Sequence, residues 1–168
     1  MSSAAPFYGL AKAGDLVGKS GRMILQDIID GKLPQPLIAQ TLTFWIVAVG
    51  DGFAAFEGEP GPHLLNPTGA VHGGWALTLI DSAAACAAQS LLPAGVGLTT
   101  IETKSNFTRP ITHDTGRVRA EAHAVGRGRT IISSEARVLD PKGRVLAHGT
   151  STILVLNGDR PADQSKGA

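Results

Sequence analysis

The sequence predicts an α+β fold: an antiparallel sheet of about six strands wrapped round one long central helix, with an N-terminal helical extension. The first observation is a long, Ala-rich stretch of strong helix formers over residues 73–92, followed by the helix-ending residues Pro93 and Gly95. The second is a set of six shorter, strand-like runs separated by turn residues. Because the helix is apolar on almost every side, it must be buried, and a sheet wrapped round it provides the cover.

The chain of 168 residues suits one domain of ordinary size with a short segment on either side. Residues 1–39 are expected to form the extension, residues 40–157 the main domain and residues 158–168 a flexible, polar tail. The sequence shows no internal repeat and no sign of a second domain.

The extension is predicted to hold one short amphipathic helix over residues 21–33, where apolar residues recur at helical spacing and Gly31 is a stop signal. Residues 1–20 mix Gly, Pro and small residues without a clear period, which indicates a loose arm with a short helical piece. Pro34 and Pro36 then favour an extended link into the main domain.

Six strands are predicted from composition and from the turns between them. Residues 40–49 are rich in β-branched and aromatic residues, and Gly50-Asp51-Gly52 predicts a hairpin turn into a second strand over residues 53–59. Residues 59–69 hold three prolines and two glycines and are expected to form a loop. After the helix, four more strands are expected, over residues 99–108, 115–125, 130–139 and 144–156. The short connections between these four strands predict a meander.

The composition argues against several classes of function. The formal net charge is +1, no run of five or more basic residues exists and aromatic residues make up 5%, a pattern that disfavours nucleic-acid binding. The single cysteine, Cys86, cannot form an intrachain disulfide and fits a reducing compartment. The N-terminus lacks a signal-peptide pattern and no apolar run could span a bilayer, so we expect a cytoplasmic protein without membrane contact. The five histidines show no HxH or HExxH spacing, so no metal ion is expected.

One acidic residue, Asp81, interrupts the apolar helix. It is the only Asp, Glu, Lys or Arg between Glu59 and Glu102. A carboxylate in such surroundings is costly to bury and usually has a function. It could act as a nucleophile or take a proton from water, while the plainer interpretation is a helix carboxylate that pairs with an arginine or acts as a cap.

The residues around this acid resemble those of a known family. Asn66, the segment His72-Gly73-Gly74 and Asp81, followed by residues 100–102 (TIE) and 106–110 (NFTRP), are similar to hotdog-fold acyl-CoA thioesterases of the phenylacetyl-CoA/4-hydroxybenzoyl-CoA (PaaI-type) group. The similarity covers roughly residues 40–157 in the order of elements, and its specific part spans residues 66–110. It implies a hotdog fold, hydrolysis of an acyl-CoA thioester to a free acid and coenzyme A, and no metal or redox cofactor.

The resemblance also implies roles for the residues at the start of the helix. Asp81 would be the nucleophile or general base, and the Gly73 N–H would polarise the thioester carbonyl, with Gly74 close behind. Free N–H groups at a helix start suit a developing oxyanion. Asn66 would position water or substrate, and His72 would shape the carbonyl pocket.

A hydroxyl group is also expected beside the acid. The resemblance assigns it best to Thr100, or to Thr99 if a gap of one residue shifts the match. Since neighbouring residues in a strand face opposite sides of the sheet, only one of the two can serve. The plain interpretation of both threonines is β propensity.

The spacing of Gly73 and Asp81 predicts that the site is shared between subunits. Eight residues of helix place them about 12 Å apart along the axis, too far for one carbonyl to touch both. Asp81 should therefore meet Gly73 of a second chain across a twofold axis with antiparallel helices. The family resemblance implies the same arrangement, in a homodimer that can pair into a homotetramer.

The substrate is expected to contact two further regions. The acyl group would lie near Trp75 and Leu79 of the Ala-rich helix. The hairpin Gly126-Arg127-Gly128-Arg129-Thr130 resembles the region that often contacts the coenzyme A nucleotide in this family, with Arg109 nearby. Paired arginines and free backbone N–H groups can hold phosphates, although the plain interpretation is a solvated turn.

Two other functions fit the same fold. A non-catalytic acyl-CoA-binding protein would need the pocket but would not need Asp81 in an apolar helix. A hotdog hydratase or dehydratase would use a histidine with a carboxylate in a different sequence setting, which this chain lacks.

Overall fold

The computed structural model describes residues 7–156, which form eleven elements. In chain order these are α1 (Ala13–Leu16), α2 (Gly21–Ile29), α3 (Leu37–Thr41), β1 (Phe44–Gly50), β2 (Phe53–Gly58), the short 3-10 helix η1 (Pro62–Leu64), α4 (Gly73–Gln89), β3 (Gly97–Phe107), β4 (Val118–Arg127), β5 (Ile131–Leu139) and β6 (Val145–Leu156). The tail expected over residues 158–168 lies outside the described residues.

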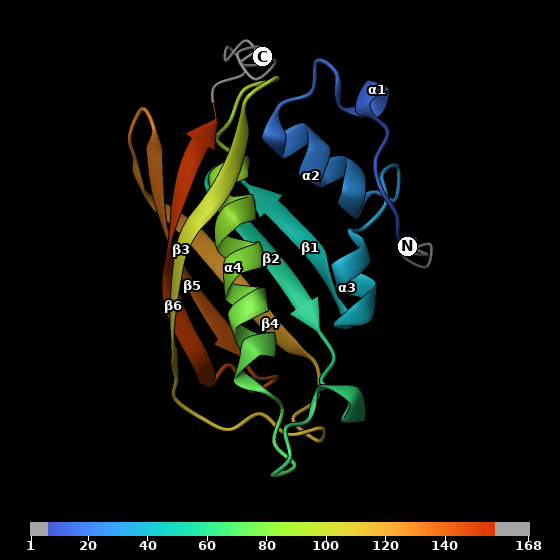
Figure 1. The fold of residues 1–168 in the computed structure, drawn as a ribbon, viewed down its shortest axis with the longest axis vertical. Coiled ribbons are helices and arrows are strands. Elements are labelled where there is room, and N and C mark those ends of the chain that lie inside the picture. Colours follow the sequence, from blue (N-terminus) through green and yellow to red (C-terminus); the bar gives the residue numbers. More distant parts are fainter. Residues whose placement is uncertain (1–6, 157–168) are drawn as a thin grey trace, which may run out of the picture.

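The strands form one six-stranded antiparallel sheet, in the order β1-β2-β4-β5-β6-β3. The sheet curves round α4, which packs against all six strands (Figure 1). This arrangement confirms the predicted architecture of one long helix held by an antiparallel sheet. The buried core is built mainly from the sheet-facing side of α4 and the inner faces of the strands.

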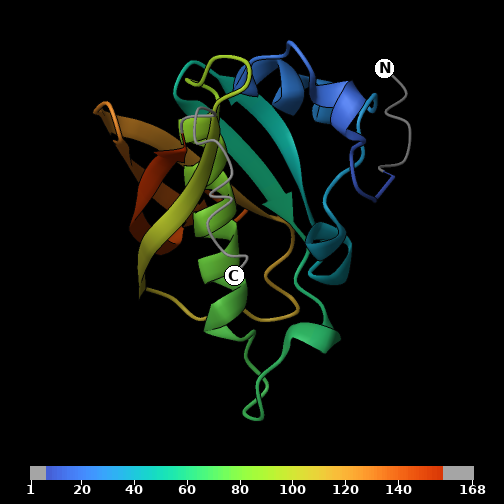
Figure 2. The ribbon, with the colours of Figure 1, turned by 45° about the horizontal axis from the view of Figure 1, so that its top comes forward.

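The predicted four-strand meander is wrong in one respect. β4, β5 and β6 do follow one another, but β3 pairs with β6 at the far edge and β4 pairs with β2. Residues 108–117 carry the chain across the end of the sheet between these positions. This order places α4 over the middle of the sheet, so that strands cover it from both sides, as Figure 2 shows.

A third N-terminal helix, α3, occupies residues that the sequence assigned partly to the first strand. Pro36 takes the N-cap position with φ −64°, and Ala39 is fully buried against the domain. The fixed φ of proline suits a helix start, and Thr43, with φ 51°, ends the turn before β1 begins at Phe44. The strand therefore starts four residues later than residue 40.

The N-terminal extension is tied to the domain at two places. The Gly21 N–H donates to the Leu92 carbonyl at 3.0 Å, and a Cβ on Gly21 would lie 1.9 Å from the Gln89 carbonyl oxygen. Only glycine fits so close to the end of α4. The buried Gln35 side chain accepts from the Ile46 N–H of β1 at 3.3 Å. The extension thus covers β1, one of the two edge strands of the sheet.

The long helix is not buried on every side. Its sheet-facing residues, such as Leu79 and Ala83, are fully buried. A second stripe is only half-buried, at Leu77, Thr78, Asp81, Ser82 and Ala85. Within one chain, the helix thus keeps one open face, and Asp81 lies on it.

Candidate active site

The helix α4 starts with one free backbone donor. His72 is the N-cap residue, and its Nδ1 accepts the Gly74 N–H at 2.9 Å. The Trp75 N–H donates to the His72 carbonyl at 3.0 Å. Among residues 7–156, nothing accepts a hydrogen bond from the Gly73 N–H. Of the two glycines, Gly73 is therefore the one whose N–H remains available at the positive end of the helix.

The side chain of Phe107 lies beside this donor. A Cβ added to Gly73 would stand 3.1 Å from the Phe107 ring, so the ring packs closely on the glycine. Phe107 is at the end of β3 and is 57% exposed. The free N–H thus has an apolar neighbour, and Gly73 itself is half-buried.

Asp81 lies two turns further along the helix, on the half-buried stripe. Its Oδ1 accepts the Thr103 hydroxyl at 3.0 Å. Within residues 7–156, its Oδ2 has no hydrogen-bond partner and no lysine or arginine pairs with it. One carboxylate oxygen is therefore held in place while the other remains free.

The hydroxyl beside the acid belongs to Thr103, and not to Thr100 or Thr99. Thr99 is exposed on the outer face of β3. Thr100 faces inwards, but a β-bulge shifts the β3–β6 register between Thr100 and Glu102. The extra residue, Ile101, points outwards with 56% exposure, so Thr100 and Thr103 both face α4. In a regular strand these two residues would face opposite sides, so no period in the sequence identifies Thr103.

Asn66 shapes the loop that leads into α4. Its Oδ1 accepts from the Thr68 N–H at 2.9 Å, the Thr68 hydroxyl at 2.7 Å and the Ala70 N–H at 3.2 Å. These contacts form a tight turn between Asn66 and Ala70. The side-chain oxygen is engaged in the turn, and the amide nitrogen is the part left to meet water or substrate.

Trp75 and Leu79 lie in the core and not on the open face of the helix. Trp75 is 3% exposed and donates its indole N–H to the Leu42 carbonyl at 2.7 Å. Its ring packs so tightly on β2 that a Cβ on Gly58 would lie 2.9 Å from it. Leu79 has no exposed surface. The expected acyl contacts at these two residues therefore have no free surface in this chain, because both point towards the sheet.

The two groups of residues expected to contact coenzyme A lie at opposite ends of the folded molecule. The hairpin residues Arg127, Gly128, Arg129 and Thr130 are all exposed between β4 and β5. β4 runs in the same direction as α4. The start of β4 pairs with Gly58, which lies beside the first turn of α4, and the far half of β4 lies beside Gly52, which is next to the end of α4. The hairpin is thus at the end of the molecule away from the start of α4, as Figure 1 shows.

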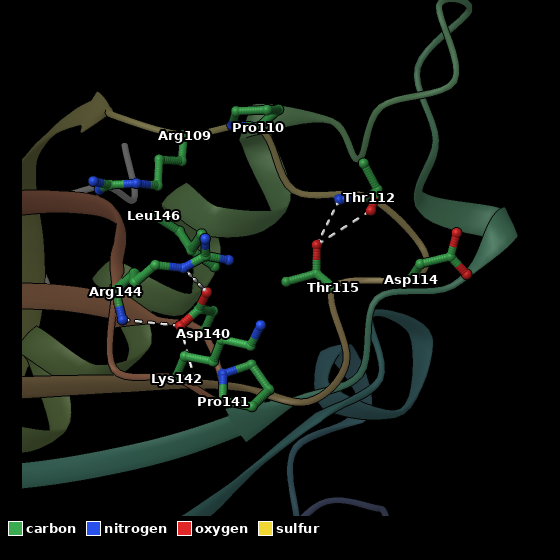
Figure 3. A pocket seen from close by; sticks show the side chains of 10 residues that line it. All are labelled: Arg109, Pro110, Thr112, Asp114, Thr115, Asp140, Pro141, Lys142, Arg144 and Leu146. Atoms are coloured by element: carbon green, nitrogen blue, oxygen red, sulfur yellow. Dashed lines mark hydrogen bonds and ion pairs between the residues drawn. The ribbon is translucent and has the colours of Figure 1, made fainter.

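Arg109 is near the start of α4, two residues beyond Phe107. It lines an open pocket of about 450 Å³ between the 109–115 loop and the β5–β6 turn (Figure 3). In this pocket the Arg144 guanidinium pairs with Asp140 at 2.6 Å, and Arg109 donates to the Val145 carbonyl at 2.6 Å. The pocket is lined by Arg109, Pro110, Thr112, Asp114, Thr115, Asp140, Pro141, Lys142, Arg144 and Leu146.

The Asp140 carboxylate organises the β5–β6 turn on one side of this pocket. Its side chain is 2% exposed. Burial alone would raise the pKa of Asp140, but the backbone N–H groups of Arg144 and Lys142 and the Arg144 guanidinium together lower it below its ordinary value. Asp140 is therefore a structural anion that holds the turn.

The one cysteine is not a candidate nucleophile. Burial, with a smaller contribution from the negative charge of Asp81, raises the pKa of the Cys86 thiol to about 12. A thiol with such a pKa stays protonated at neutral pH, and the thiolate is the nucleophilic form. Asp81 is thus the stronger candidate on this helix.

Three of the five histidines make local contacts. His72 caps α4, His113 lies 3.3 Å from Asp114, and the His123 ring packs on Phe53 with 4.9 Å between centroids. Within the described range of 7–156, no three His, Cys, Asp or Glu side chains gather as metal ligands. In the same range, no helix is long and apolar enough to cross a membrane.

Comparisons with known proteins agree with the fold. Residues 68–147 match the family model of the thioesterase superfamily. A phenylacetic acid degradation-related protein from Ralstonia eutropha superposes with a TM-score of 0.70 at 26% identity, covering 77% of this chain and 98% of that one. A mutant of the phenylacetic acid degradation protein PaaI from Thermus thermophilus gives 0.63 at 26% identity, covering 70% and 96%. No curated protein matches the sequence.

A more distant structure shares the architecture over more of the chain. A thioesterase from Haemophilus influenzae superposes with a TM-score of 0.70 and covers 88% of this chain and 99% of that one. At 19% identity, this likeness shows the fold alone. The six-stranded sheet, the helix α4 and these comparisons together confirm the hotdog fold and the similarity to PaaI-type proteins.

Proposed function

Since this chain has a hotdog fold and resembles PaaI-type thioesterases, we propose that it is an acyl-CoA thioesterase. It would hydrolyse an acyl-CoA to a free acid and coenzyme A. The family match supports a thioester hydrolase in general, and it spans both the start of α4 and Asp81. The observation that carries the proposal of an acyl-CoA thioesterase is that α4 holds two reactive groups. One is a half-buried carboxylate that is hydrogen-bonded through one oxygen only, and the other is a free N–H at the helix start.

Two features support a site built from two chains. Gly73 and Asp81 lie about 12 Å apart along one helix, so a single carbonyl reaches only one of them. Among residues 7–156, β3 is an edge strand that pairs on one side only, with β6, whereas the N-terminal extension covers the other edge strand, β1. A twofold pairing along β3 would bring the open faces of two α4 helices together, antiparallel, with each Asp81 near the partner's helix start. The resulting homodimer could pair further into a homotetramer.

The chemistry follows from this placement. The thioester carbonyl oxygen would accept the Gly73 N–H, which stabilises the negative charge that develops on it. Asp81 would then either take a proton from a water that attacks the carbonyl carbon, or attack that carbon itself. In both routes the carbon–sulfur bond breaks, the electron pair leaves with sulfur, and the coenzyme A thiolate is protonated. In the second route, water then hydrolyses the acyl–Asp81 anhydride.

Thr103 supports Asp81 by holding Oδ1. Its hydroxyl occupies one carboxylate oxygen at 3.0 Å and leaves Oδ2 to react. It takes the place that the family resemblance gave to Thr100. We therefore include Thr103 with Asp81, Gly73 and Asn66 in the proposed site.

The substrate placement needs to differ from that expected from the sequence alone. The acyl group would lie along the half-buried stripe of α4, near Leu77 and Thr78, because Trp75 is in the core. In an antiparallel pair, the partner's 126–130 hairpin would come to the end of the molecule where Gly73 and Arg109 lie. Both candidate phosphate contacts would then serve one coenzyme A, from two subunits.

The function is tested by free-thiol release from short-chain, long-chain and aromatic acyl-CoAs. We expect hydrolysis of at least one of these by the wild type, and a loss of about 100-fold or more in Asp81→Ala, because the base or nucleophile is gone. Asp81→Asn is the matched control for size, and it should be as inactive. Acyl thioesters of N-acetylcysteamine, which lack the nucleotide, should show a higher KM if the arginines bind phosphate.

A non-catalytic acyl-CoA-binding protein would give a different result in the same experiment. It would retain acyl-CoA without releasing thiol, and Asp81→Ala would bind as the wild type does. Thiol release by wild type that is unchanged in Asp81→Ala would overturn the proposed mechanism.

A further inference from the structure

We propose that Ser151 is a positioning residue for the reaction at Asp81, acting through Thr103, with Ser134 behind it. The inference rests on the proposed thioesterase function. It assigns a role to a line of buried hydroxyl groups that runs from Asp81 into the core. Neither serine reaches the substrate side of the helix.

The hydroxyl line consists of the side chains of Thr103, Ser151 and Ser134, which are cross-strand neighbours on three adjacent strands. Thr103 of β3 is directly opposite Ser151 of β6, and Ser151 is directly opposite Ser134 of β5. Ser151 and Ser134 are each 1% exposed, under α4, in a sheet face otherwise made of residues such as Ala136 and Ile153. A buried hydroxyl without a partner costs free energy, so its presence in an apolar core needs a reason.

The number of hydroxyl protons determines which group donates and which accepts in each hydrogen bond of the line. The ionised Asp81 carboxylate can only accept, so Thr103 donates its single hydroxyl proton to Oδ1. In the 2.9 Å contact between Thr103 and Ser151, Ser151 must therefore be the donor. The Ser151 oxygen is then free to accept a hydrogen bond in its turn.

Ser134 is placed to be the next donor. Its Oγ is fully buried and has no hydrogen-bond partner among residues 7–156. Directly opposite residues of an antiparallel pair have Cβ atoms about 4.5–5.5 Å apart, so a rotation of the Ser134 side chain would bring the two hydroxyls within hydrogen-bonding reach. The order of donation is then Ser134 to Ser151 to Thr103 to Asp81.

This order makes Ser151 matter for catalysis without touching substrate. A hydroxyl that accepts a hydrogen bond becomes a better donor, so Ser151 strengthens the bond from Thr103 to Asp81. It also stops Thr103 from rotating its proton towards Ser151. The carboxylate is thereby held with Oδ1 engaged and Oδ2 directed to the reacting carbonyl. Losing Ser151 should lower kcat and leave KM nearly unchanged.

Ser105 provides a matched control. It is also on the inner side of β3, two residues beyond Thr103, and its Oγ is likewise buried without a partner among residues 7–156. Its cross-strand neighbour is Gly149, which carries no side chain. Ser105 is therefore a buried hydroxyl of the same strand that stands outside the line.

The test is a double-mutant cycle on kcat with the best acyl-CoA substrate. We expect Ser151→Ala to lower kcat about tenfold with KM within about twofold, as for a lost hydrogen bond between two buried hydroxyl groups. Ser134→Ala should lower it less, and Ser105→Ala should match wild type. In a Thr103→Val background, Ser151→Ala should cause no further loss, because its only route to Asp81 is gone.

Several results would overturn the inference. These are wild-type kcat in Ser151→Ala, an equal loss with and without Thr103, a loss in Ser105→Ala as large as in Ser151→Ala, or an effect on KM alone. Thermal melting and sedimentation check that each variant folds and assembles. If Ser151→Ala does not fold, the cycle is run with Ser151→Cys, whose thiol fills the space but donates weakly.

The outcome separates this inference from the proposed function. A wild type that releases no thiol, or an Asp81→Ala variant as active as wild type, refutes the proposed function. An active enzyme that depends on Asp81 but keeps its kcat in Ser151→Ala refutes the positioning role alone.

Discussion

At the scale of single residues, the start of α4 shows how local contacts distinguish neighbouring backbone N–H groups. His72-Gly73-Gly74 offers several N–H groups, but the His72 imidazole occupies that of Gly74 and leaves that of Gly73 free. The sequence predicts the helix start and its glycines. It does not predict which N–H is free, because that depends on the rotamer of the His72 side chain.

The first prediction concerns His72. His72→Ala removes the N-cap acceptor, so the free energy of unfolding should fall by about 0.5–2 kcal/mol. His72→Asn supplies another good cap and should recover most of that loss, together with thiol release. The measurement is urea unfolding with a thiol assay on both variants. If His72→Asn is stable but inactive, the imidazole itself contacts the substrate.

The second prediction concerns Asp140. Its pKa in the folded protein is lowered from 3.8, so its ionised form stabilises the fold above that value and this contribution is lost as pH falls through the lower folded pKa. Asp140→Asn should therefore lower the melting temperature at pH 7 and flatten its decline in acid. Melting curves between pH 7 and pH 3 measure both. A parallel decline in variant and wild type would contradict the assignment.

At the scale of elements, composition and turns predict most of the fold. The central helix, the second strand and the last three strands appear within about three residues of their expected ends, because apolar runs and Gly or Pro turns are local signals. The pairing of β3 with β6 was not predicted, since register depends on contacts between distant segments. The helix α3 was missed because five residues between proline and a strand carry almost no periodic signal.

The bulge in β3 had the largest consequence for the site. It turns Thr103 inwards next to Asp81, whereas a regular strand would turn it outwards. Nothing in the sequence around Ile101 marks this extra residue. The sequence therefore identifies the acid, Asp81, but not the hydroxyl that holds it.

The third prediction uses the two threonines that the bulge brings to the same face. Thr103→Val removes the bond to Oδ1 at nearly constant volume and should lower kcat about ten- to 100-fold. Thr100→Val makes the same change on the same strand and face, away from the acid, and should be close to wild type. Steady-state kinetics of both variants decide the point. Equal losses would show that the threonines act through packing.

At the scale of the whole molecule, the open features lie together. The stripe of α4 that contains Asp81 is half-buried, and β3 is the edge strand left without a cover by the extension. The sequence predicts a shared site from helix geometry alone, because eight helical residues separate donor and acid. What a single chain does not contain is the second half of each proposed site.

The central claim is that each site takes Gly73 from one chain and Asp81 from the other. Gly73→Pro removes the free N–H at little cost to the helix, since proline suits the first helical position and His72 already has the extended ψ of 133° that a following proline prefers. The exposed Phe107 ring, 3.1 Å from the added Cβ, has to move aside slightly. Each homodimer, Asp81→Ala or Gly73→Pro, should lose activity about 100-fold or more.

The most direct measurement is thiol release by heterodimers purified through two different tags. A heterodimer of Asp81→Ala with Gly73→Pro should recover about half of the wild-type turnover, because one of its two sites is intact. Wild type paired with the Gly73→Pro/Asp81→Ala double variant should be inactive, because both sites are damaged. The reverse result, an inactive first pair and a half-active second pair, would place the whole site within one chain and contradict the account.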